Sequence, residues 1–395
     1  MAIPLSWSIY STVEIPCNKR IQFSTVKPFI LGLLWFIVNA LLYNKLGIKI
    51  VFDSHRYLAY AEAIETGSSY WYQAESIFYS SYTFVLYLFL YLLHLPVGVV
   101  IFVQIVFSGV ALIYLYRTVL NITSNNHTAF ICLLLYILWP EIHQWNFYIH
   151  TESLYISATI FLLYSISEYR KSSFNILMTL LIVLFTFFLR PNGFFLLLGA
   201  SASVISYLHQ RNSFKFSANS IILVAVVIVP LLIYVAKEAL EIYSPMQYLV
   251  QGQVIQGYDG LHVSIAPVTP DVENSVLKQL WCVVVTQPYA YVKLLLLRFV
   301  FFWGQARPYY SAIHNFVIFL YFIPVYGAAL YGMKRLSQHP VKPFMLVVAI
   351  LQTTMSLVIA VDWDNRFIVP LMPFVFIFAA IGFHSLYAKF DAPKL

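Results

Sequence analysis

The chain has 395 residues, of which 61% are hydrophobic and only 10% are charged, and its mean hydropathy is +0.78. No water-soluble domain of this length hides so much apolar surface in one core, so these values exclude a soluble globular protein. The net charge of +7 would suit a nucleic-acid-binding protein. The basic residues lie mostly in short gaps between apolar runs, however, where such residues set membrane orientation. We therefore predict an integral membrane protein that contacts lipids and binds no nucleic acid.

Apolar runs that suit a bilayer span recur along the whole chain. We expect an all-α polytopic protein with one transmembrane domain, residues 1–395, of about ten spans. With this arrangement the inner side carries thirteen basic and three acidic residues, a balance of +10 against −3 outside. This asymmetry favours a cytoplasmic N-terminus. The spans are expected near residues 28–48, 97–117, 128–145, 151–168, 174–189, 193–209, 218–237, 313–333, 342–361 and 366–388.

Two segments on the predicted outer side are longer than simple connections, residues 49–96 and 238–312. Each contains an apolar run, about 80–95 and 288–303, that breaks the charge pattern if it spans the bilayer. We therefore expect both runs to be helices in the outer interface. In the second run, Arg298 is expected to extend toward the lipid headgroups, as Lys293 is. Long loops of this kind often bind substrate.

The first polar cluster directly follows the first span and contains Asp53, His55 and Arg56. Asp53 is a natural N-cap for a helix that begins there. The same carboxylate could instead take a proton from an attacking hydroxyl group, as general-base glycosyl transfer requires. The residues alone leave both interpretations open.

A second cluster runs from Pro140-Glu141-Ile-His143 through His150-Thr151-Glu152-Ser153, in a turn between two spans. Glu152 suits the first turn of a helix, where an acid compensates the helix dipole. With Asp53 and His150, it could also bind sugar hydroxyl groups or a metal ion. We predict no definite cofactor, and a divalent cation, Mg²⁺ or Mn²⁺, stays an open alternative with these three residues as candidate ligands.

Two arginines complete the set of candidates. Arg190, in Leu189-Arg-Pro-Asn192-Gly193, lies between two apolar runs, and a guanidinium group there would bind a phosphate through two hydrogen bonds. Arg366 follows Asp362-Trp-Asp364-Asn at the outer start of the last span. It forms either a solvated ion pair with an aspartate or a second phosphate contact, because a lipid-phosphate leaving group needs positive charge as its bond to sugar breaks.

The order and spacing of these motifs resemble the GT-C superfamily of multi-span glycosyltransferases, especially the branch of protein O-mannosyltransferases and aminoarabinose transferases. The resemblance covers nearly the whole chain, and no single motif is specific. It rests on Asp53 with Tyr57-Leu-Ala-Tyr-Ala, on Glu152, on Arg190-Pro-Asn-Gly, on the helix from Pro288, and on Arg366-Phe-Ile-Val-Pro-Leu-Met-Pro.

The resemblance implies a GT-C-like bundle in a prokaryotic inner membrane or the endoplasmic reticulum membrane, with the active site on the periplasmic or lumenal face. It implies inverting transfer of a sugar from a polyprenyl-phosphate donor to a hydroxyl group of a lipid, glycan or protein. Asp53 then corresponds to the catalytic base, Glu152 to the second acidic position, and Arg190 and Arg366 to donor phosphate ligands. Our further candidates for substrate contacts are His55, Arg56, His150, Asn192 and Asp364.

The chain departs from this family in two places. Many relatives of the mannosylating branch have an adjacent Asp-Glu pair after the first span, whereas Ser54 and His55 follow Asp53 here, and the second acidic position is Glu152 rather than an aspartate. The sugar, the acceptor and the need for a metal are therefore left open.

Three other functions compete with this hypothesis. A secondary transporter would place ionisable groups at mid-membrane beside paired broken helices, and no such pairing is evident, although Arg190-Pro-Asn-Gly would suit a broken helix. A polymerase or ligase would use a lipid-diphosphate oligosaccharide. A noncatalytic scaffold has no need for arginines and carboxylates gathered near lipid on one face.

Overall fold

The computed structural model describes residues 26–68, 74–168, 173–210, 248–249, 251–266, 276–336 and 339–391. Within these ranges the chain is helical, and the only β pairing is three isolated bridges. The elements are α1 (Val26–Leu46), α2 (Asp53–Glu65), α3 (Ala74–Ile77), α4 (Ser80–Leu86), η2 (Tyr87–Leu92), α5 (Gly98–Thr123), α6 (Asn126–Ile137), α7 (Pro140–His143), η3 (Gln144–Phe147), α8 (Glu152–Ser167), α9 (Ser173–Phe187), α10 (Gly193–Gln210), α13 (Val276–Thr286), α14 (Pro288–Gly304), α15 (Ala312–Arg335), α16 (Val341–Ile359), η5 (Val369–Leu371) and α17 (Met372–Asp391).

Six helices in the described ranges are long and apolar enough to cross a membrane. They match six of the predicted spans. The prediction of an all-helical membrane protein is therefore confirmed for the described residues, by the length and composition of these helices. The predicted span 218–237 lies outside the described residues. The six segments are Phe29–Leu46, Gly98–Thr123, Gly193–Gln210, Ala312–Arg335, Val341–Ile359 and Val369–Lys389.

The three remaining predicted spans correspond to helices of 12 to 16 residues, α6, α8 and α9. The expected span 128–145 is wrong at its C-terminal end, because α6 ends at Ile137 and α7 begins at Pro140. Proline disfavours a helical conformation in the residue before it, and Trp139 is indeed extended, with φ −100° and ψ 93°. The chain therefore turns through α7 and η3 before α8 begins.

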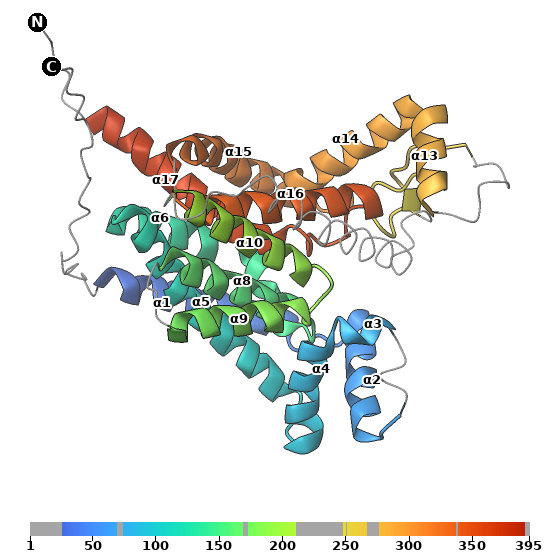
Figure 1. Cartoon of the computed structure of the whole chain (residues 1–395), viewed down its shortest axis with the longest axis horizontal. Helices are drawn as coiled ribbons and strands as arrows, with labels where there is room; N and C mark the ends of the chain where they lie inside the picture. The colour runs from blue at the N-terminus through green and yellow to red at the C-terminus, as the bar shows by residue number, and fades with distance from the viewer. Residues whose placement is uncertain are drawn as a thin grey trace, which may run out of the picture.

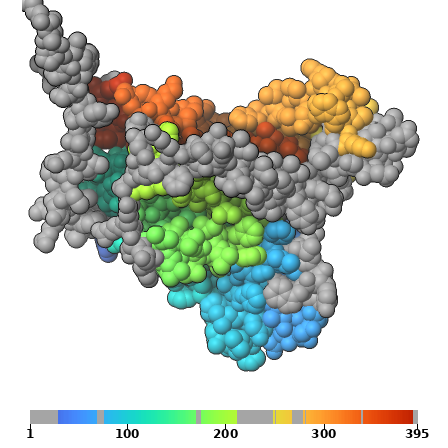
Figure 2. All heavy atoms as spheres, viewed as in Figure 1, coloured from blue at the N-terminus to red at the C-terminus, as the bar shows by residue number. Residues whose placement is uncertain are grey.

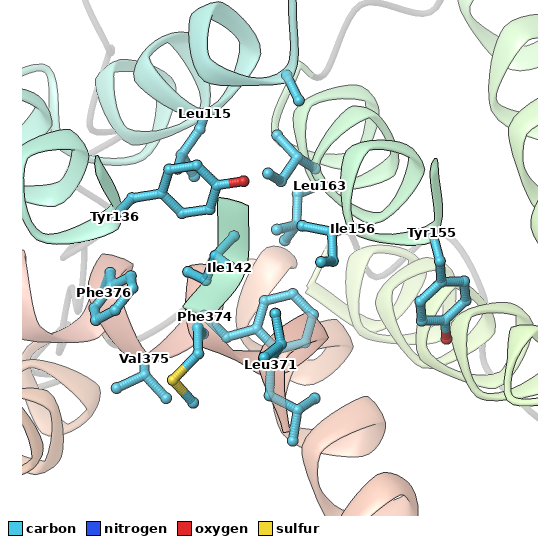
Figure 3. Packing of buried hydrophobic residues seen from close by; sticks show 14 of the residues in the cluster. Leu115, Tyr136, Ile142, Tyr155, Ile156, Leu163, Leu371, Phe374, Val375 and Phe376 are labelled. Atoms are coloured by element: carbon cyan, nitrogen blue, oxygen red, sulfur yellow. The ribbon is translucent and has the colours of Figure 1, made fainter. Parts of the chain in front are cut away.

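The bundle is built from pairs of helices that are distant in sequence. α15 packs along α17, α5 along α8, and α10 along α16 (Figure 1). Figure 3 shows the core where α5, α6, α8 and α17 meet, with Ile156 of α8 facing Leu371 and Phe374. Tyr155, the neighbour of Ile156, points away from this core, and its hydroxyl group donates to the backbone oxygen of Asn192. Helix α8 is therefore buried on both sides.

The elements of the two long outer segments lie at the same end of the molecule. The first segment forms α2 to η2, and the described part of the second contains α13 and α14. Figures 1 and 2 show these groups as two protrusions at the end away from the start of α1 and the last turns of α17. This placement agrees with both segments lying on one side of the membrane, and their interfacial position stays a prediction.

The expectation for Arg298 is wrong. Its side chain is fully buried and donates to the carbonyl oxygens of Leu357 and Val358, at 2.7 and 2.9 Å, and of Gln253 and Tyr248. The last carbonyl groups of a helix have no intrahelical partner, so the C-terminus of α16 supplies ready acceptors. Arg298 thus fastens α14, Tyr248 and Gln253 to α16 instead of reaching headgroups, while Lys293 is exposed.

Two glycines allow α15 and α17 to touch backbone to backbone. A Cβ atom on Gly332 would lie 1.9 Å from the carbonyl oxygen of Phe378, and one on Gly382 would lie 1.9 Å from that of Ala328. Small residues at such crossings are typical of packed membrane helices. A Cβ atom on Gly327, also in α15, would have no neighbouring atom within 4 Å.

We expect Gly332→Ala to lower the melting temperature of the detergent-solubilised protein, because α15 and α17 must separate at an overpacking cost of about 1–3 kcal/mol. Gly327→Ala is the matched control and should leave the melting temperature unchanged or raise it, because alanine favours helix by about 1 kcal/mol. Fluorescence-detected size exclusion after heating measures both. Equal behaviour of the two variants would contradict the close crossing.

Candidate active site

Five charged residues predicted from the sequence converge at one place. The Arg366 guanidinium group lies 2.8 Å from the Asp53 carboxylate and 3.0 Å from that of Glu152. Arg190 lies 3.2 Å from the same Glu152 oxygen, and Arg56 lies 3.2 Å from Asp53. Three guanidinium groups therefore surround two carboxylates, contributed by α2, α8, the α9–α10 turn and the segment before η5.

Asp53 is held in place by short backbone pairing beside it. The Lys49 amide donates to the Phe147 carbonyl at 2.8 Å, and the Ile149 amide donates back to Lys49 at 3.1 Å. This pairing aligns the segment before α2 with the segment before α8. Asp53 lies in the first turn of α2, where its carboxylate contacts Arg56 and Arg366 and caps no backbone amide. The N-cap interpretation of Asp53 is therefore wrong, because two guanidinium groups occupy its carboxylate.

Glu152 lies in the first turn of α8, where the helix dipole favours a negative charge. Its side chain is 0% exposed, so its charge needs partners inside the protein. His150 adds a third neighbour, with Nδ1 3.6 Å from Glu152 and Nε2 3.1 Å from the Val51 carbonyl oxygen. Burial lowers the pKa of His150, and the Glu152 carboxylate opposes part of this shift.

Arg190 reaches Glu152 from a tight turn. A Cβ atom on Gly193 would lie 1.8 Å from the Thr186 carbonyl oxygen, so only glycine permits α9 and α10 to approach so closely. The Arg190 guanidinium group lies over the Tyr155 ring, 5.2 Å from its centre. Asn192 does not contact the charged cluster, and instead donates to Gln352 of α16 at 3.0 Å. Asn192 therefore positions the turn that carries Arg190.

Arg366 lies in a turn that the side chain of Asp362 stabilises through backbone amides. The Asp362 carboxylate accepts from the backbone amides of Arg366 and Phe367, and Asn365 has a left-handed conformation with φ 64°. Asp364 is half-buried, and its Oδ1 atom is buried with no hydrogen-bond partner. Burial, reinforced by the Asp362 carboxylate, raises the pKa of Asp364 well above its usual range. This carboxyl group therefore keeps its proton to a higher pH than an ordinary aspartate does.

Two residues outside the predicted set support this turn. Arg307 is buried and donates to the Asp362 carbonyl at 3.0 Å, and Glu141 accepts from Asn365 at 3.0 Å while pairing with His314 at 3.3 Å. Arg307 carries a weaker signal in the sequence than Arg190 does: it precedes Pro308 shortly after the apolar run 288–303, but polar residues lie close to it on both sides.

His55 is the predicted site residue that the structure does not bring into the cluster. It is exposed on α2, because two positions after Asp53 a helix presents a different face.

Within the described ranges no group of three or more His, Cys, Asp or Glu side chains could hold a metal ion. Arg366 lies between the carboxylates of Asp53 and Glu152, so its positive charge occupies the position that a cation would need, and His150 contacts Glu152.

The comparisons with known proteins returned nothing that identifies this site: no family model, no curated protein and no solved structure matches the chain. The likeness to the GT-C superfamily therefore rests on the motifs of the chain itself and stays a prediction.

We expect Glu152→Gln to destabilise the protein strongly, because it leaves two guanidinium groups without their shared carboxylate, and breaking a buried pair costs about 3–5 kcal/mol. The measurement is the melting temperature in detergent. Glu65→Gln, on the exposed end of α2, is the control and should change little. The double variant Glu152→Gln with Arg190→Gln should recover part of the loss, and a double variant that melts lower than Glu152→Gln would contradict the pairing.

The Asp53 carboxylate gives a pH-dependent prediction. Burial raises the pKa of Asp53, but Arg366 and Arg56 outweigh it and hold the pKa below the usual value of 3.8. A lowered pKa stabilises the folded state above pH 3.8, and the contribution disappears as pH falls through the folded-state value. Asp53→Asn should therefore melt below wild type at neutral pH, and the difference should shrink as the pH falls below that usual value. A difference independent of pH would show that Asp53 is not ionised in an ion pair.

Proposed function

We propose that this protein is a membrane glycosyltransferase that transfers a sugar from a polyprenyl-phosphate donor to a hydroxyl acceptor, with inversion, on the outer membrane face. The observation that carries the proposal is the bridge from Arg366 to both Asp53 and Glu152, with Arg190 on Glu152. Such a site offers a carboxylate base next to guanidinium groups that a phosphate can engage.

The geometry of the arginines supports phosphate binding. Arg190 Nη1 and Arg366 Nε lie within 3.2 Å of Glu152 Oε1, yet neither nitrogen makes a well-directed hydrogen bond. Buried donors normally have partners. A phosphate oxygen would supply acceptors in the directions that Glu152 leaves unfilled.

The proposed reaction uses one base and no covalent intermediate. The acceptor hydroxyl oxygen bonds to the anomeric carbon on the side opposite the lipid phosphate, and its proton passes to the Asp53 carboxylate. The bond between the anomeric carbon and the phosphate oxygen breaks, and its electron pair leaves with the phosphate. Arg190 and Arg366 stabilise the negative charge that develops there.

Donor binding would also make Asp53 a better base. In the unliganded site Arg366 lies 2.8 Å from Asp53, and its positive charge lowers the pKa of that carboxyl group. A phosphate competes for the same guanidinium group, so part of the Arg366 contact would move from Asp53 to the phosphate. The pKa of Asp53 then rises, which favours proton transfer from the acceptor only when donor is present.

The test is sugar transfer by purified protein in nanodiscs, with a panel of radiolabelled polyprenyl-phosphate sugars and a membrane extract as acceptor source. Wild type should transfer from at least one donor, and Asp53→Asn should lose about 10²–10⁴-fold in rate, as loss of a general base does. Glu65→Gln is the control. Equal rates for wild type and Asp53→Asn would remove Asp53 from the base role. Solute uptake in proteoliposomes without any transfer would favour the transporter instead.

A further inference from the structure

Four aromatic side chains from four separate segments gather beside the charged cluster, and we call them the aromatic ledge: Phe52, Tyr258, Tyr309 and Trp363. The Phe52 and Trp363 rings are 5.1 Å apart, and the Tyr258 and Tyr309 rings are 5.2 Å apart. The Tyr309 hydroxyl group donates to the Trp363 carbonyl oxygen, which joins the two pairs.

Backbone contacts fix the ledge next to the site. The Gln256 amide donates to the Val361 carbonyl at 2.7 Å, and the Val361 amide donates to Val254 at 3.1 Å. Residues 254–256 of the second outer segment therefore lie against the segment that leads into the turn of Trp363 and Arg366. Phe52 immediately precedes Asp53, so the ledge borders both partners of the central ion pair.

Exposure increases from Glu152 and Arg190 toward Asp53 and the ledge. The side chains of Glu152 and Arg190 are 0% and 4% exposed, that of Asp53 is 26% exposed, and Phe52 and Trp363 are 66% and 40% exposed. The ledge thus lies on the open side of Asp53, and Arg190 lies on the buried side. A molecule that offers its hydroxyl group to Asp53 from outside would pass over the ledge.

The backbone at Phe52 is strained. Its φ of 49° and ψ of −116° are unfavourable for a bulky residue. A glycine or asparagine would relieve it, but neither would present a ring to Trp363. Strain of this kind gathers at binding and catalytic sites, where the surrounding structure maintains it.

We propose that the aromatic ledge binds a pyranose ring of a glycan acceptor and presents one of its hydroxyl groups to Asp53, an inference that rests on the proposed function. One face of many pyranose rings carries several C–H groups, which pack on aromatic rings, while the hydroxyl groups point outward from the rim. The ledge supplies the apolar surface, and Asp53 with Arg56 supplies partners for the hydroxyl groups. The acceptor class is therefore a carbohydrate rather than a protein or a simple lipid.

A membrane-interface belt is the alternative use of exposed aromatic residues. Belts favour Trp and Tyr, whose polar tips reach the headgroups. Phe52 has no polar tip, and the Tyr309 hydroxyl group is already bonded to Trp363. These two features favour a rigid stacking surface over a belt.

The test uses saturation-transfer NMR on the protein in nanodiscs, with methyl α-D-mannopyranoside, methyl β-D-glucopyranoside and methyl β-D-galactopyranoside as probes and no donor present. With wild type, saturation should transfer from the protein to the ring C–H protons of at least one probe. Trp363→Ala and Phe52→Ala should each weaken binding about 3- to 10-fold, as loss of an aromatic contact does. Trp363→Phe should retain binding, which separates loss of stacking from loss of folding.

Trp281→Ala is the matched control, because Trp281 is 70% exposed on α13 and lies outside the ledge. No saturation of any probe by wild type would overturn the proposal, and so would equal loss in Trp281→Ala and Trp363→Ala. In the transfer assay, Trp363→Ala should raise the KM for a glycan acceptor and leave the KM for donor unchanged; a rise for donor alone would overturn the acceptor assignment. Probe binding without any transfer would reject the glycosyltransferase proposal while keeping a sugar site at the ledge.

Discussion

The Glu152 carboxylate is the constraint around which this end of the molecule is organised. It is fully buried, and Arg190 and Arg366 both depend on it for compensation of their charge. A buried ion without a partner is very costly, so the folded state exists only when the start of α8, the α9–α10 turn and the turn before η5 meet. Asp53 completes the charge balance through Arg366 and brings the first outer segment to the same place.

The buried and partly buried arginines are of two kinds with different physical roles. Arg298 and Arg307 donate to backbone carbonyl oxygens, which cannot move away, and so fix α14 and the turn at Asp362. Arg190 and Arg366 contact carboxylates, and an incoming anion can compete for such contacts. Arg298 and Arg307 therefore stabilise the fold. Arg190 and Arg366 can move their hydrogen bonds from a carboxylate to a bound anion.

The charged cluster is buried on one side and accessible on the other. The side of the cluster that carries Arg190 is closed by α8 and by the α9–α10 turn, while the side that carries Asp53 opens toward exposed aromatic rings. In an in-line displacement, the attacking acceptor oxygen and the leaving phosphate lie on opposite sides of the anomeric carbon of the donor. The proposed lipid phosphate and the proposed acceptor would satisfy this requirement by approaching from the two sides of Asp53 and Arg366.

Much of the fold class was evident from the sequence because the bilayer constrains composition: a long apolar helix satisfies all of its backbone hydrogen bonds within lipid. That rule located the six long helices to within a few residues, and it drew attention to Asp53, Glu152, Arg190 and Arg366 because charge near hydrocarbon is costly. It failed where local geometry overrides hydropathy, as at Pro140, which ends the continuous helix expected over 128–145.

Contacts between distant segments were decided only by the tertiary structure. Arg298 and Arg366 are both arginines beside apolar runs, yet one bonds five times to backbone carbonyl oxygens and the other bridges two carboxylates. No local pattern distinguishes them, because the difference depends on which carbonyl groups or acids another part of the chain brings within reach. The sequence by itself determined which charged side chains needed partners, and the packing of the helices determined which groups they contact.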